Sequence, residues 1–345
     1  DLPGVGENMQ DHTYASMSWQ LQEGNITLDS LRNDPAFAEK QQELYAKNSQ
    51  NPGSLLTEGV PTVAYISLEE LVGKDECKKL VSDAEQYVAK CDKPYKPTLE
   101  KQLEWLQKYP DHIAQMELIG VDGFFATNGA PEPGKNYMTL LAAQQHLFSR
   151  GSVHIASTDV AAHPKIDAGY FTAPWDLAVA TAGTKFLRKI AGTKQYASYI
   201  DKEVVPGTAS SSDEDLKQYT RTIGTTTEYH HLGSASMLPR EHGGVVDADL
   251  RVYGTKNVRC IDASIMPIHV SAHIQALVYG IAEAGADIIK RAHSLEGLKV
   301  KAAAGAPVEA GTKKAAGVVG LQVSRCGCGS EFVGHGAASC AICAQ

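Results

Sequence analysis

Two histidines occupy positions where an imidazole could act on a substrate. His230 lies in the run YHHLGS at residues 229–234, and His273 stands in the first turn of a segment with a helical pattern. The unpaired amides and the dipole at a helix start disfavour protonation of a nearby imidazole. A neutral imidazole can remove the proton of an alcohol while hydride leaves the carbon for an acceptor. The pair is therefore a candidate for alcohol oxidation, with a cofactor required as the acceptor.

Either histidine could instead have an ordinary structural role. Most histidines fill surface positions or hydrogen-bonded positions in the core, so a lone histidine seldom identifies a catalytic base. The sequence around each residue must therefore decide between the two interpretations.

The seven cysteines raise the questions of a metal site and of disulfides. The tail contains CGC at residues 326–328 and CAIC at residues 340–343, with His335 between them, a spacing related to that of zinc sites. An extension rich in Ala and Gly has no core to orient ligands, so we predict no metal. Cys77 and Cys91 could form a disulfide, but two free thiols are favoured because no leader sequence is visible.

Composition excludes some classes of partner. With 345 residues, 43% of them hydrophobic, the chain is long enough to bury a large core. A formal net charge of −8 offers no basic field for phosphates, so we expect no nucleic-acid partner. No run of about 18 apolar residues is present, so membrane contact is unsupported. The sequon at Asn25 matters only if the chain is secreted, and the compartment stays open.

The elements that must position the histidines are a sheet and several helices. Residues 14–21 alternate like a strand, residues 29–109 have a helical pattern typical of an insertion, and residues 116–155 are again strand-like. Pro174 opens a helix that ends near Gly192.

Three local features complete the prediction of elements. Asp176 is expected to be the N-cap of the helix that Pro174 opens. Residues 250–253 and 258–261 predict a hairpin, because a turn-forming GTKN segment joins two β-rich runs. Apolar residues at steps of three and four predict a helix over residues 271–291, with Ser271 as its cap.

Three motifs in order resemble the glucose–methanol–choline (GMC) oxidoreductases. Residues 1–12 read DLPGVGENMQDH, like the family's signature segment. Residues 229–239 read YHHLGSASMLP, and GGVVD follows at residues 243–247, like its catalytic-histidine segment. Residues 258–267 read VRCIDASIMP and continue through SAH into a helix, like its C-terminal flavin-contacting motif. The resemblance covers most of the chain except the helical region and the tail, and it is closest to aryl-alcohol and glucose oxidase-like members.

The resemblance assigns roles to individual residues. The family places its base after an aromatic residue and three before the Gly of a Gly-Ser or Gly-Thr step, which selects His230 and leaves His231 a structural role. The family's partner position holds His or Asn, and here it is His273. The residues that match flavin-contacting positions, or the segment near the flavin and the domain junction, are Asn8, Asp11, His12, Asp262, Ala263, His273 and Ile274.

The family also implies a fold class and a domain division. We expect an α+β substrate-binding domain with an antiparallel sheet and helices, plus remnants of an FAD-binding α/β domain. Residues 1–20 are the signature segment and connector, 21–257 the substrate-binding region, and 258–292 a strand and helix that return to the FAD domain. Residues 293–345 form a linker and cysteine-containing tail, expected to be disordered, as is clearest over residues 297–320.

The expected activity is FAD-dependent oxidation of a primary or secondary alcohol, with oxygen or a quinone as electron acceptor. The family's Gly-x-Gly-x-x-Gly turn, which cradles the FAD pyrophosphate, does not occur in this sequence, and Gly4 and Gly6 cannot replace it. The missing FAD-binding portion leaves the activity of this chain alone doubtful. The alternatives are a GMC-fold lyase or cyclase without net redox chemistry, and a non-catalytic truncated fragment. The resemblance slightly favours a secreted protein.

Overall fold

A computed structural model describes two units, Asp1–Ser294 and Leu295–Gln345. The described residues are 1–47, 53–57, 62–207, 210, 212–294, 323–325 and 331–333. In the second unit, β9 (Val323–Arg325) pairs antiparallel with β10 (Glu331–Val333). The predicted linker at residues 297–320 lies outside the described residues, as does the whole group formed by Cys326, Cys328, His335, Cys340 and Cys343.

An antiparallel sheet of six strands forms the centre of the first unit. Its order is β2–β3–β4–β1–β7, and β8 pairs with the start of β1. This confirms the prediction of an α+β fold built on an antiparallel sheet. The strands are β1 (Thr13–Leu21), β2 (Thr62–Ser67), β3 (Ala114–Val121), β4 (Tyr137–Gln144), β7 (Ile200–Val205) and β8 (Thr225–Thr227). A separate antiparallel pair consists of β5 (Ser152–His154) and β6 (Lys165–Asp167).

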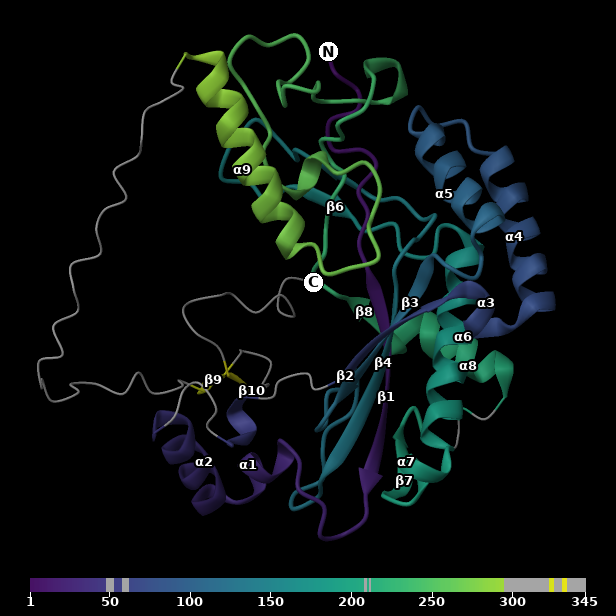
Figure 1. The fold of residues 1–345 in the computed structure, drawn as a ribbon, viewed down its shortest axis with the longest axis vertical. Helices are drawn as coiled ribbons and strands as arrows, with labels where there is room; N and C mark the ends of the chain where they lie inside the picture. Colours follow the sequence, from purple (N-terminus) through teal and green to yellow (C-terminus); the bar gives the residue numbers. More distant parts are fainter. Residues whose placement is uncertain are drawn as a thin grey trace, which may run out of the picture. The chain divides into compact units, whose positions relative to one another are not determined.

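Helices α4, α5, α6 and α8 lie on one side of the strands, and α9 lies apart from them (Figure 1). The α-helices are α1 (Asp29–Asn33), α2 (Pro35–Lys47), α3 (Leu68–Val72), α4 (Lys74–Ala89), α5 (Lys96–Lys108), α6 (Pro174–Ala191), α7 (Lys194–Ala197), α8 (Asp213–Tyr219) and α9 (Gln275–Ala292). Short helical turns are η1 (Leu55–Thr57), η2 (Thr220–Gly224), η3 (Arg240–His242) and η4 (Ala263–Ile265). None of the described helices is both long enough and apolar enough to span a membrane.

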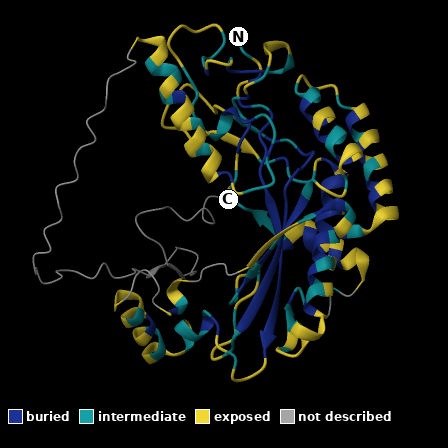
Figure 2. Ribbon diagram, in the orientation of Figure 1, coloured by how far each residue is buried: buried dark blue, intermediate teal, exposed yellow. Residues whose placement is uncertain are grey.

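The main core lies between the sheet and helices α3, α4, α5 and α6. Figure 2 shows the central strands as mostly buried, and all nine residues of β1 are buried. Apolar side chains of β1, including Met17 and Trp19, pack in one cluster with Trp175 and Leu187 of α6. Helix α4 contributes its apolar face to the same cluster. The buried sheet therefore gives a rigid base for the loops at its ends.

The predicted helical region at residues 29–109 also contains a strand. Strand β2 pairs in register with β3, from Thr62 opposite Gly120 to Ile66 opposite Met116. Its sequence TVAYIS is rich in β-branched and aromatic residues, which favour a strand over a helix. The prediction of a purely helical insertion is therefore wrong, because this segment supplies the sheet with its edge.

Two predicted helix caps are also wrong. The N-cap of α6 is Ala173, and Asp176 lies inside the first turn, where tertiary contacts hold its carboxylate. The N-cap of α9 is Ile274 without a side-chain cap, so the helix begins after His273 rather than at Ser271. Ser271 instead donates a hydrogen bond to the carbonyl of Ala114 in β3. In both places the side chain bonds to a residue distant in the sequence instead of capping the helix.

The predicted hairpin at residues 250–261 forms only a short pairing. Arg251 and Arg259 form an isolated antiparallel bridge, and the amide of Val252 donates to the carbonyl of Val258. Val252 is packed against a small apolar cluster that includes Val246 and Leu250. The pairing lies outside every described strand, so the expected strand over residues 258–261 is wrong, although the turn between the two runs is present.

Candidate functional site

Backbone pairing brings the three sequence motifs together. Gln10 and Leu232 exchange hydrogen bonds in both directions, at 2.9 Å and 3.0 Å. The amide of Gly6 donates to the carbonyl of Ser234 at 2.8 Å, which ties residues 1–12 to residues 229–239. The amide of Ala235 donates to the carbonyl of Ser264 at 2.8 Å, which adds the third motif. Segments more than 200 positions apart in the sequence thus form one structure.

Gly233 permits the close approach of the first two motifs. Its φ of +92° lies in the region that favours glycine, and a Cβ there would meet the carbonyl oxygen of Asn8 at 2.3 Å. The side chain of Asn8 links these segments. Its Nδ2 donates to Oγ of Ser236 and to the backbone carbonyl of Pro267, and its Oδ1 accepts a hydrogen bond from Nε of Arg150. The side chain of Asn8 is therefore engaged inside the chain.

Strand pairing at the end of β1 positions the first two imidazoles. Thr13 pairs with Thr227 of β8, and the amide of Glu228 donates to the carbonyl of His12 at 2.9 Å. The chain then turns, and the amide of His230 donates to the carboxylate of Asp11 at 3.1 Å. Backbone pairing on one side and the carboxylate of Asp11 on the other hold His12 and His230 next to each other.

The imidazoles of His12, His230 and His273 form a row. Nδ1 of His12 lies 3.0 Å from Nδ1 of His230, and the rings of His230 and His273 have centroids 5.1 Å apart. Exposure rises along this row, because the side chain of His12 is fully buried while that of His273 is 54% exposed. The two predicted catalytic histidines are therefore brought together, with the ring of His273 half-exposed.

Two buried carboxyl groups lie beside this row, and sequence reasoning missed both. Oε1 of Glu117 lies 2.9 Å from Nε2 of His273, and Oε1 of Glu228 lies 3.5 Å from the same atom. Oε2 of Glu228 is 3.7 Å from Nδ1 of His230. A signal for Glu117 exists in the sequence, because a carboxylate inside the apolar strand AQMELIGV needs a partner. Glu228 carries no such signal.

Burial and mutual charge perturb these groups strongly. Burial, reinforced by His230 and His146, lowers the pKa of His12 to about 3. Burial and the neighbouring His273 also lower the pKa of His230. Burial and the carboxylate of Glu117 raise the pKa of Glu228 to about 8. Near neutral pH the His12 and His230 rings are accordingly neutral, and they face a carboxyl group that resists ionisation.

His269 and His146 extend the cluster into the core. The ring of His269 stacks on that of His12 at a centroid distance of 3.9 Å, and Nε2 of His146 lies 2.8 Å from Oγ of Ser271. Burial lowers the pKa of His146 to about 4 and that of His269 well below its usual value. No sequence motif drew attention to either residue.

The same atoms could also approach a cation. His12, Glu228 and His230 offer three ligand atoms within 4.8 Å of one another, and Glu117, Glu228 and His273 offer a second such set. The separation between the two Nδ1 atoms, 3.0 Å, is also that of an ordinary hydrogen bond. The absence of a metal stays a prediction.

A cavity of about 540 Å³ lies between the second and third motifs. Asp262 and Ala263, two of the residues expected to contact a cofactor, line it. Ile274 is buried in one cluster with Leu232 and Met266 and is not among the residues that line this cavity. The full set of lining residues is Met9, Val153, Ile166, His231, Leu232, Ser234, Asp262, Ala263, Ser264 and Val278.

Asp11 contacts both His231, which lines this cavity, and the backbone amide of His230 in the imidazole row. The carboxylate of Asp11 accepts a short hydrogen bond from the hydroxyl of Tyr170, and it lies 3.4 Å from Nε2 of His231. His231 is 49% exposed and lies outside the row. Like Asn8, the side chains of Asp11 and His12 bond within the chain, so direct cofactor contact by these three residues stays a prediction.

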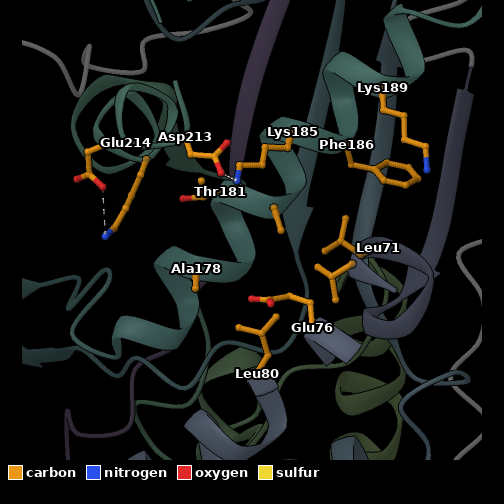
Figure 3. Close-up of a pocket in the computed structure, with 13 residues that line it drawn as sticks. Leu71, Glu76, Leu80, Ala178, Thr181, Lys185, Phe186, Lys189, Asp213 and Glu214 are labelled. Carbon is orange, nitrogen blue, oxygen red and sulfur yellow. Dashed lines mark ion pairs between the residues drawn. The ribbon is translucent and has the colours of Figure 1, made fainter. Parts of the chain in front are cut away.

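A second cavity, of about 610 Å³, has a lining of different chemical character (Figure 3). It lies among α3, α4, α6 and α8, and its lining includes no histidine. Four of its charged side chains form two ion pairs, Lys185 with Asp213 and Lys217 with Glu214. Nothing there resembles an acid–base site, so the imidazole row is the candidate site.

Comparison with known proteins agrees with the motifs. A family model described as GMC oxidoreductase matches residues 148–282. The GMC oxidoreductase family protein Mala s 12 of Malassezia sympodialis is 32% identical, over 84% of this chain and 43% of its own length. A dehydrogenase of Monascus ruber is 31% identical, over 83% of this chain and 48% of its own. The chain thus spans less than half the length of these relatives.

Solved structures share the fold. A fungal aryl-alcohol oxidase is 28% identical and superposes with a TM-score of 0.69, over 85% of this chain and 49% of its own. An FAD-dependent oxidoreductase of Chaetomium thermophilum, 23% identical, superposes with a TM-score of 0.73 over 85% and 49% of the two chains. At that identity the second likeness shows the fold alone.

Proposed function

We propose, from the premise that this chain belongs to the GMC oxidoreductase family, that it forms the substrate side of an enzyme that oxidises an alcohol with FAD. His230 is the base in this proposal, and His273 orients the hydroxyl group. The observation that carries it is the convergence of the two imidazoles, with centroids 5.1 Å apart, from segments that the sequence separates by 43 positions (273 − 230).

The environment of His230 suits a base. Burial and His273 lower its pKa, so the ring is unprotonated near neutral pH and can accept a proton. Its neighbour His273 is half-exposed and is held by the carboxylate of Glu117. A ring held in this way can fix a substrate oxygen by a hydrogen bond while His230 takes the hydroxyl proton.

The residues beside the row are compatible with part of an FAD molecule. The cavity next to the row is lined mainly by apolar side chains, and Asp262 and Ala263 are at its wall. Bound FAD would accept the hydride that leaves the alcohol carbon. The given sequence contains no Gly-x-Gly-x-x-Gly turn, so none of its residues is assigned to the pyrophosphate.

The electron acceptor in this proposal is oxygen or a quinone. The relatives include proteins named as dehydrogenases and structures named as oxidases, which support one or the other acceptor. The substrate is a small primary or secondary alcohol, which the family name and the aryl-alcohol oxidase likeness support.

The test replaces each of two adjacent histidines in the FAD-loaded enzyme. His230→Ala should slow flavin reduction by alcohol by about 10² to 10⁴-fold, as is usual for loss of a general base. His231→Ala is the matched comparison, because this neighbouring ring is half-exposed and lies outside the row. Since His231 also lines the cavity beside Asp262 and Ala263, the FAD content of both variants is measured first. The measurement is stopped-flow bleaching of the oxidised flavin, with the circular dichroism of both variants compared with that of the parent.

Equal losses in the two variants would show that His230 is not the base. Retention of activity in both would refute the proposed site. A lyase or cyclase of the same fold would turn over substrate without bleaching the flavin, so product analysis in the same experiment separates these chemistries.

A further inference from the structure

We propose that His12 is a positioning residue that fixes the tautomer of His230, so that Nε2 of His230 carries the free lone pair. The chemical use of that lone pair rests on the proposed function. The tautomer itself rests only on the contacts of the two rings, and it is tested separately.

The first step is the hydrogen bond between His12 and the backbone. Nε2 of His12 lies 2.9 Å from the carbonyl oxygen of Gln145. A carbonyl oxygen can only accept, so Nε2 of His12 must carry a proton. The side chain of His12 is fully buried, which disfavours a second proton on the ring. His12 is therefore a neutral imidazole whose Nδ1 is an acceptor.

The second step concerns the contact between the rings. Nδ1 of His12 and Nδ1 of His230 are 3.0 Å apart, a hydrogen-bond distance that requires one proton between the two atoms. Since Nδ1 of His12 has a lone pair, the proton belongs to His230. A neutral His230 with a proton on Nδ1 has its lone pair on Nε2.

The third step is the rigidity of His12. Its ring stacks on His269 at 3.9 Å with an interplanar angle of 26°. Its carbonyl accepts from the amide of Glu228, so the backbone is also fixed. A ring flip would place a carbon toward the carbonyl of Gln145 and lose that bond. The orientation of the donor and of the acceptor is thus determined by the fold.

The carboxyl group of Glu228 does not replace this contact. Its Oε2 lies 3.8 Å from Nδ1 of His12 and 3.7 Å from Nδ1 of His230, beyond hydrogen-bond distance. Of the described residues, His12 provides the hydrogen-bonding contact to Nδ1 of His230.

The arrangement has a direct consequence for proton transfer. The hydroxyl proton of the alcohol moves to Nε2 of His230, which becomes an imidazolium and keeps its Nδ1 proton. The bond to His12 then has a charged donor and becomes stronger. His12 does not take the proton, because that would place a positive charge at a fully buried ring.

The tautomers can be read in the 345-residue chain without any cofactor. Long-range ¹H–¹⁵N correlation spectra of histidine-labelled protein at pH 7 distinguish a protonated from an unprotonated ring nitrogen. The expected result is a protonated Nδ1 and a bare Nε2 for His230, with the reverse for His12. Assignment uses the single variants His12→Gln and His230→Gln. A proton on Nε2 of neutral His230 would overturn the proposal.

Two replacements of His12 separate positioning from packing. His12→Gln can accept from His230 through its Oε1 and donate to Gln145 through its Nε2, so it should retain the Nδ1 tautomer. His12→Leu fills the space but accepts nothing, so both tautomers of His230 should appear in its spectrum. If the Leu variant keeps the parent tautomer, His12 does not determine it.

The rate of flavin reduction in the FAD-loaded enzyme is an independent test of this role. We expect His12→Leu to slow flavin reduction by clearly less than the about 10² to 10⁴-fold of losing the base, because part of His230 keeps the competent tautomer, and to alter its pH profile. His12→Gln should recover most of the rate. His146→Gln is the control, since it removes another buried ring that does not contact His230. Equal losses in the Gln and Leu variants would assign His12 a merely structural role.

The outcomes distinguish this proposal from the proposed function. A wrong tautomer in the spectra overturns the role of His12 and leaves the test of His230 by alanine unaffected. The expected tautomer in an enzyme whose His230→Ala variant is fully active would refute the base and leave the role of His12 in orienting the ring. Zinc found by elemental analysis, together with unprotonated Nδ1 atoms on both rings, would also overturn the proposal.

Discussion

At the scale of single residues, the site shows how position decides what a histidine can do. His12 is fully buried and neutral, His230 is largely buried and this burial, reinforced by His273, lowers its pKa, and His231 is half-exposed next to a carboxylate. The side-chain type is the same in all three. What differs is the number of protein groups around each ring, which sets the cost of a positive charge.

His273 is predicted to orient the substrate rather than to take its proton. Its Nε2 lies 2.9 Å from a carboxylate oxygen of Glu117, and its ring is 54% exposed. His273→Asn keeps a hydrogen-bonding group, so the FAD-loaded enzyme should retain much more flavin reduction than with His273→Ala. Stopped-flow absorbance measures both rates.

The comparison with His230 decides between the roles. If His273→Asn and His273→Ala both abolish reduction as fully as His230→Ala does, then His273 is the base or shares the proton with His230. Thermal unfolding of all three variants controls for lost structure.

At the scale of elements, the site depends on how a helix is joined to the sheet. Asp176 in the first turn of α6 accepts hydrogen bonds from the amides of Phe148 and Ser149, at 2.9 Å and 2.7 Å. These residues follow β4, so one buried carboxyl group joins α6 to the end of that strand. Burial raises the pKa of Asp176 to about 6, while the two amides oppose this rise.

We predict that Asp176→Ala strongly destabilises the chain. The substitution leaves two amides without their acceptor in a buried place, at about 1–3 kcal/mol for each. Urea denaturation should give a free energy of unfolding lower by about 2–6 kcal/mol. Asp176→Asn keeps one acceptor oxygen, so it should lose about half as much. Equal stability of the Ala variant and the parent would show that these bonds contribute nothing net.

At the scale of the whole molecule, buried histidines link stability to pH. The pKa of His269 lies well below 6.5, mainly because of burial, with His12 as the next cause. The unfolded chain therefore binds more protons than the folded chain as the pH falls below about 6.5. The stabilisation is complete above that pH and is lost as the pH falls. The raised pKa of Glu228 acts in the opposite direction between its unfolded value and about 8.

His269→Phe should reduce this acid sensitivity. A phenyl ring can still stack on His12, but it cannot take up a proton on unfolding. Between pH 7.5 and pH 5 the variant should lose less free energy of unfolding than the parent, by at most about 1.36 kcal/mol for each pH unit below 6.5. Urea denaturation at both pH values measures the difference, and the contributions of Glu228 and Asp176 cancel. Parallel curves for the two proteins would contradict the prediction.

Elements with a strong local period and the three motifs can be recognised from the amino-acid sequence alone. The ladder of apolar residues over α9 and the run of β1 depend only on spacing along the chain, so they are visible without a structure. The family and the pair His230 and His273 came from short runs of residues that are likewise local.

Only the tertiary structure decided which groups surround that pair. His12 and His230 lie 218 positions apart, and Glu117 and His273 lie 156 apart, so no local pattern places them in contact. The two predicted helix caps were wrong for the same reason. The carboxylate of Asp176 and the hydroxyl of Ser271 form hydrogen bonds with residues distant in the sequence instead of capping a helix. Tautomer and pKa depend on burial and on neighbours from other segments, which exist only once the chain has folded.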